Sequence, residues 1–109
     1  NLLQVLELLA DKRKKGENIM LTCGFVMSNI RNLLRIKEMA EAGYGETRIA
    51  AETDMNPYVV KKNYQACRRF SLASLQTALN DLAQMNIEIR QGGRQFERLE
   101  EILVKLLTA

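Results

Sequence analysis

Apolar residues recur every three or four positions along most of the chain, which is the spacing that places them on one face of an α-helix. Six stretches follow this pattern, and glycines or turn-forming residues separate them. We expect helices at residues 2–14, 18–42, 46–52, 57–69, 71–90 and 95–107. Strand-like alternation is limited to residues 87–90, where it continues a helical pattern. The pattern predicts an all-α protein, built as a compact bundle of about five to six helices.

The boundary at residue 57 carries the clearest local signal. Pro57 suits the first turn of a helix because its missing N–H would have no partner there. The side chain of Asn56 can accept a hydrogen bond from a free N–H group of the same turn. Residues 46–52 and 57–69 therefore predict a short hairpin of the helix-turn-helix kind.

The residues of this hairpin leave two functional interpretations open. Apolar or small residues stand where the two helices of a helix-turn-helix touch, at Ile49, Ala50, Met55 and Val60. Against a DNA-binding motif, Asp54 occupies the turn position where glycine is usual, and Asn63 stands where an apolar contact is expected. The hairpin is either a structural element or a DNA-binding or regulatory module at residues 46–69. In the second case, phosphates would be contacted by Lys61, Lys62, Arg68 and Arg69.

The helix at residues 71–90 has one polar residue in its apolar seam. The seam has a three-four spacing and consists of Leu72, Leu75, Leu79, Leu82, Asn86 and Ile89. In one interpretation, helical drift rotates Asn86 to the boundary of the core, beside Met85. In the other, Asn86 is a buried polar group that fixes helix register or the choice of partner.

Composition removes several classes of chemistry. The chain has 109 residues, no histidine and two cysteines. Without histidine, neither a Ser-His-Asp hydrolase nor a histidine-bearing metal site can form, and two cysteines alone are too few for a zinc or iron–sulfur site. We expect Cys23 and Cys67 to be buried, reduced thiols, and we expect no catalytic residues, metal ligands or cofactors.

Charge and length indicate a small cytoplasmic domain without membrane contact. The net charge of +3 is too small to indicate nucleic-acid binding by itself. Charged residues interrupt the apolar stretches before they reach the roughly 18 residues that a membrane span requires. Because the sequence starts at Asn1, inside an apolar run, we expect a single helical domain over residues 1–109 that is part of a longer polypeptide.

Several short motifs between residues 33 and 107 resemble, in their order and spacing, the C-terminal domain of the delta subunit of the bacterial DNA polymerase III clamp loader. The motifs are LLRIK at 33–37, PYVVKK at 57–62, ACRRFS at 66–71 and IRQG at 89–92, with Gly43, Ile49, Ala50 and Leu75 between them. Two positions depart from the family pattern, because Asn86 replaces the usual aspartate and Arg90 the usual lysine.

The resemblance implies an all-helical collar domain at the C-terminal end of a protein of the clamp loader. In this family the C-terminal domains of delta, delta-prime and the gamma or tau subunits pack into a ring. That ring holds the clamp loader together while it places the sliding clamp on primed DNA. The ATPase-type modules and the clamp-contacting element of the family lie N-terminal to this domain. The resemblance thus implies a part of the DNA polymerase III holoenzyme that supplies assembly and no catalysis.

We expect the contacts with other subunits on the helix at residues 71–90 and on the segment before it. The expected interface residues are Arg69, Phe70, Leu72, Leu75, Leu79, Asn86 and Arg90. For each leucine taken singly, burial in the core of its own domain is the alternative.

Overall fold

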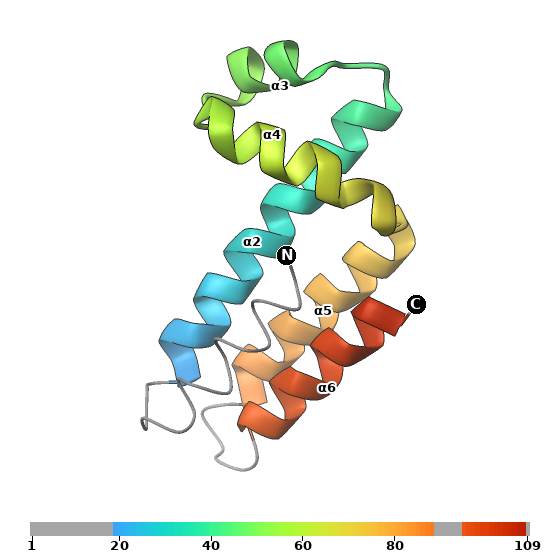
Figure 1. Cartoon of the computed structure of the whole chain (residues 1–109). Helices are drawn as coiled ribbons and strands as arrows, with labels where there is room; N and C mark the ends of the chain where they lie inside the picture. The colour runs from blue at the N-terminus through green and yellow to red at the C-terminus, as the bar shows by residue number, and fades with distance from the viewer. Residues whose placement is uncertain (1–18, 89–94, 109) are drawn as a thin grey trace.

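The computed structural model describes residues 19–88 and 95–108, which form five α-helices and one short 3-10 helix (Figure 1). The elements are α2 (Ile19–Glu41), α3 (Glu46–Thr53), α4 (Pro57–Ala66), η1 (Cys67–Arg69), α5 (Leu72–Glu88) and α6 (Gln95–Thr108). Neither of the two described ranges contains a strand. The all-α prediction is confirmed, whereas the helix predicted at residues 2–14 lies outside the described residues.

Helices α2, α5 and α6 form the body of the molecule, and α3 and α4 form a hairpin at one end (Figure 1). Helix α5 contacts both α2 and α6, and it runs antiparallel to each of them. The α3–α4 hairpin packs across the C-terminal end of α2. Because α5 shares long contacts with two helices, its sequence has the largest influence on how the body is assembled.

One continuous apolar core joins the three body helices to the hairpin. The residues of the core that are fully or almost fully buried include Cys23, Val26 and Ile30 of α2, Leu75, Leu82 and Met85 of α5, Leu99 and Leu103 of α6, and Ile49 and Val60 of the hairpin. Full burial of an aliphatic side chain of this size stabilises a fold by about 1.5–3 kcal/mol. The hairpin is therefore part of the same folding unit as the body.

The buried stripe of α5 differs from the predicted seam, and Asn86 is exposed. The most buried positions of the helix are Leu75, Ala78, Leu82 and Met85, whereas Leu72 and Leu79 are only half-buried. At about 100° per residue, the stripe turns by about 80° around the helix axis between Leu75 and Met85, so it moves away from Asn86. Asn86 therefore does not fix helix register as a buried polar group. Its predicted rotation out of the buried seam is confirmed, and it goes beyond the core boundary to an exposed position.

We predict that Leu82→Ala lowers the free energy of unfolding by about 2–5 kcal/mol, because it leaves a cavity at a position that is 0% exposed. The matched control is Leu21→Ala, since Leu21 is 74% exposed on α2 and its truncation is expected to cost less than about 0.5 kcal/mol. Chemical denaturation followed by circular dichroism measures both values. Equal losses in the two variants would show that α5 is not packed as described.

Candidate subunit interface

Helices α3 and α4 form the predicted hairpin, and its expected contact residues meet the core. Ile49 of α3 and Val60 of α4 are fully buried, and Ala50 and Met55 are partly buried against the same core. The geometry predicted for the hairpin at these four positions is confirmed. Such a geometry serves a structural hairpin and a DNA-binding one equally well.

The turn of the hairpin is formed by Asp54 in a left-handed backbone conformation, with φ 58° and ψ 15°. Glycine adopts this conformation most readily, and aspartate is among the few other residues that tolerate it. Asn56 then starts α4, because its Oδ1 accepts a hydrogen bond from the Tyr58 N–H at 2.8 Å, with Pro57 in the first turn as predicted. The sequence alone counted Asp54 against a helix-turn-helix, and its left-handed conformation removes that objection.

Asn63, the other residue that departs from the helix-turn-helix pattern, forms a hydrogen bond within its own helix. Its side chain is half-buried, and the amide donates a hydrogen bond to the Val59 carbonyl at 2.9 Å, within α4 itself. This local hydrogen bond gives the half-buried Asn63 amide a partner at a position that is partly shielded from water.

The basic residues that a DNA-binding interpretation requires are all exposed. They are Lys61 and Lys62 on α4, and Arg68 and Arg69 on η1. The guanidinium of Arg68 lies over the ring of Tyr64, 5.6 Å from its centroid, which is within the range of a cation–π contact. Solvated cations on the outer face of a helix are usual, so their exposure alone does not distinguish phosphate binding from hydration.

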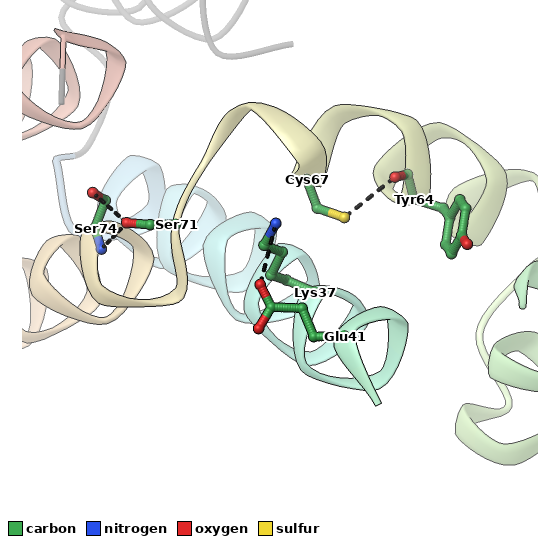
Figure 2. Close-up of polar contacts among 6 residues, drawn as sticks. All are labelled: Lys37, Glu41, Tyr64, Cys67, Ser71 and Ser74. Carbon is green, nitrogen blue, oxygen red and sulfur yellow. Dashed lines mark hydrogen bonds and ion pairs between the residues drawn. The ribbon is translucent and has the colours of Figure 1, made fainter. Parts of the chain in front are cut away.

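The segment between the hairpin and the body ends one helix and starts the next (Figure 2). Helix α4 continues into the tighter 3-10 helix η1, and the backbone becomes extended at Phe70. The N–H of Phe70 donates a hydrogen bond to the Cys67 carbonyl at 3.2 Å. Ser71 caps α5, because its Oγ accepts a hydrogen bond from the Ser74 N–H at 3.0 Å. An N-cap of this kind adds about 1 kcal/mol to the free energy of unfolding. The predicted start of a helix near Ser71 is confirmed.

Cys67 is the first residue of η1 and is buried, with its side chain on the side of the segment that faces α2 (Figure 2). Its Sγ donates a hydrogen bond to the Tyr64 carbonyl at 3.2 Å. On α2, Lys37 and Glu41 form an ion pair at 3.4 Å. Burial raises the pKa of the Cys67 thiol, and the positive charges of Lys37 and Arg68 offset only part of this rise. The thiol is therefore protonated at neutral pH.

The second cysteine, Cys23, is fully buried on α2, and burial raises the pKa of its thiol as well. Both cysteines are free. The prediction of buried, reduced thiols is thus confirmed at both positions.

The residues expected at an interface with other subunits lie in several different environments. Leu75 is fully buried, so its side chain belongs to the core and cannot meet a partner. Phe70, Leu72 and Leu79 are half-buried and pack against the core. Arg69 and Asn86 are exposed, but they lie near opposite ends of α5. Arg90 lies outside the described residues.

A groove between α5 and α6 was not predicted from the sequence. Its volume is about 190 Å³, and Asp81 and Lys105 face each other across it with 3.9 Å between carboxylate oxygen and ammonium nitrogen. The rest of the lining is small or apolar and consists of Ala73, Ser74, Thr77, Ala78, Ile102 and Leu106. The sequence shows the small residues of α5. It does not show that α6 packs beside them, and the groove exists only because it does.

Within the described part of the chain, no three histidine, cysteine, aspartate or glutamate side chains gather in a way that could hold a metal ion. Among helices α2 to α6, none has the length and apolar character that crossing a bilayer demands. The described residues define a small all-α domain with a groove between α5 and α6.

Comparison with known proteins makes this class specific. The family model described as "DNA polymerase III delta subunit, C-terminal domain" matches residues 1–107. The DNA polymerase III subunit delta of Bacillus subtilis (strain 168) is 30% identical over 103 residues, which cover 94% of this chain and 30% of that protein. The solved structure of the Bacillus subtilis DNA clamp loader delta protein has a TM-score of 0.82 at 30% identity, over 95% of this chain and 31% of that one. The chain belongs to the family formed by the C-terminal domains of DNA polymerase III delta subunits.

The chain spans about a third of the length of these two relatives. Their names describe a polymerase subunit and a clamp-loader protein, and the resemblance found in the sequence is confirmed. The comparisons therefore favour the structural interpretation of the hairpin at residues 46–69 over a DNA-binding module.

We predict that Asp54→Val lowers the free energy of unfolding by about 1–2 kcal/mol, because a β-branched residue is strained in the left-handed region. Thr47→Val places the same residue at an exposed position of α3 and is expected to change this free energy by less than about 0.5 kcal/mol. Urea denaturation measures both variants. An unchanged stability of Asp54→Val would contradict the left-handed turn.

We also predict that the folded chain protects both thiols from Ellman's reagent at pH 8, and that denaturant exposes them. Because the folded state keeps these protons where the unfolded state has lost them, the free energy of unfolding falls as pH rises above the ordinary thiol pKa. The double variant Cys23→Ala/Cys67→Ala should show a shallower fall. Fast labelling of the folded chain would disprove the burial of these thiols.

Proposed function

We propose that this chain is the assembly domain of a clamp-loader delta subunit, packing against the gamma or tau and delta-prime subunits and so holding delta in the DNA polymerase III clamp loader. Through that complex it supports the placement of the sliding clamp on primed DNA, in the cytoplasm. The observation that carries the proposal is the family match over residues 1–107, together with a fold that has a TM-score of 0.82 to a clamp loader delta protein.

The surface of the body suits an assembly role. The domain buries a continuous core and still leaves large apolar side chains exposed on all three body helices. They are Leu21 and Phe25 on α2, Ile87 on α5, and Val104 and Leu107 on α6. Apolar side chains on several outer faces lower the free energy of association when other helices cover them. This role requires rigid helix faces and no catalytic group.

We predict that the complete polypeptide carrying these residues co-purifies with the gamma or tau and delta-prime subunits of the same organism, and that removing residues 1–109 abolishes this association. Size-exclusion chromatography of the mixed, purified subunits measures it. The control is the same polypeptide with Thr47→Val at an exposed position of α3, outside the apolar side chains named above, and it is expected to associate like the unmodified polypeptide. Association that persists without residues 1–109 would refute the proposal.

A further inference from the structure

One exposed face of helix α5, as far as its side chains are described, consists of uncharged residues. Seven of its exposed residues cover a continuous arc of about 120° around the helix axis, at about 100° per residue. We call this arc the α5 outer face, and it consists of Ala73, Gln76, Thr77, Asn80, Ala83, Gln84 and Ile87. A helix of 17 residues normally keeps its solvent face hydrated with charged side chains.

The exposed faces of the other four described helices carry charged side chains. Examples are Arg31 on α2, Arg48 on α3, Lys61 on α4 and Glu101 on α6. By contrast, the described charged side chain of α5, Asp81, lies beside the arc and pairs with Lys105. The contrast matters because covering a charged face with protein requires the removal of water from ions, which costs several kcal/mol for each unpaired ion. The α5 outer face can be covered without that cost, and the depletion of charge is the compositional mark of an interface centre.

The polar groups on the α5 outer face are already partly satisfied. The side-chain amide of Gln76 donates a hydrogen bond to Asn80 Oδ1 at 3.0 Å, so this pair enters a dry contact with fewer unmet hydrogen bonds. Ala73 and Ala83 add little bulk, and short side chains allow a second helix axis to approach to about 8 Å. The side chain of Ile87 is 60% exposed, so covering it with a partner removes apolar surface from water and favours binding.

The groove between α5 and α6 borders the same face, because Ala73 and Thr77 belong to both. Its floor is small and apolar, and its volume of about 190 Å³ is enough to receive an aliphatic side chain from outside. The charges nearest to it, those of Asp81 and Lys105, pair with each other at 3.9 Å, as charges at the rim of an interface commonly do.

We infer that the α5 outer face and this groove dock an uncharged helix of another protein of the clamp loader, which inserts an aliphatic side chain between α5 and α6. The inference rests on the proposed function and names the surface that performs it. The contacting face of the occupant is uncharged because a lysine or glutamate on it would meet no opposite charge among the seven residues of the arc, and the charges at the rim, Asp81 and Lys105, already pair with each other. A nucleic acid does not fit, since the seven residues offer phosphates no cation and Lys105 is paired with Asp81.

The test introduces one charge into the face of the complete polypeptide and measures its binding to the purified partner subunits. Ala83→Lys is expected to raise the Kd at least about tenfold, because the new ammonium must be buried without a partner. Its matched control, Ala51→Lys on exposed α3, is expected to bind as tightly as the unmodified polypeptide. Thermal unfolding monitors whether both variants stay folded.

A second pair of variants keeps the shape of the side chain and changes only its charge. Gln84→Glu on α5 is expected to weaken binding several-fold, and Gln65→Glu on exposed α4 to leave it unchanged. If the unmodified polypeptide binds its partners and both α5 variants bind equally well, the docking surface is wrong and the proposed function stands. If the unmodified polypeptide binds no partner, the proposed function fails. Self-association that only the α5 variants lose would assign the face to a second copy and overturn the inference.

Discussion

Helix α5 packs against α2 on one side and α6 on the other, and its buried stripe holds both helices in place. Leu75, Leu82 and Met85 form this stripe, and each is almost completely removed from water. The neighbouring helices have no comparably long contact with each other, so the body depends on the apolar surface that α5 supplies. The position of α5 in turn determines where its opposite, exposed side lies.

The segment from Cys67 to Ser71 couples the hairpin to α5. It changes the chain from helix to extended backbone at Phe70 and restarts a helix at Ser71, with each step satisfied by a local hydrogen bond. Cys67, the first residue of the segment, is buried, so the turn is held by packing as well as by hydrogen bonds. Arg68 and Arg69 can then remain exposed and solvated. In this segment the most distinctive sequence motif of the chain, ACRRFS, is explained largely by local structure.

Local signals in the sequence were enough to predict the five described helices and the starts of α4 and α5. Pro57, Asn56 and Ser71 act through hydrogen bonds to residues close by in the chain, and such effects can be predicted without knowledge of the fold. Asn86 was harder to place because its environment depends on the angle at which α5 crosses its neighbours. The same limit applies to Leu75, which periodicity alone cannot assign to a core or to an interface. The family was recognised from ordered motifs, whereas the groove between α5 and α6 required the packed structure.

In the proposed interface, stability and association are carried by opposite sides of α5. The inner side consists of large aliphatic residues, where the loss of a few methylene groups costs several kcal/mol. The outer side consists of small or neutral polar residues and the exposed Ile87, and most substitutions there leave the folded state nearly unchanged. Residues on the outer side can therefore change with the surface of a partner while the domain stays folded. Because an uncharged face accepts a neutral partner and penalises a charged one, it also selects between partners without any attractive charge of its own.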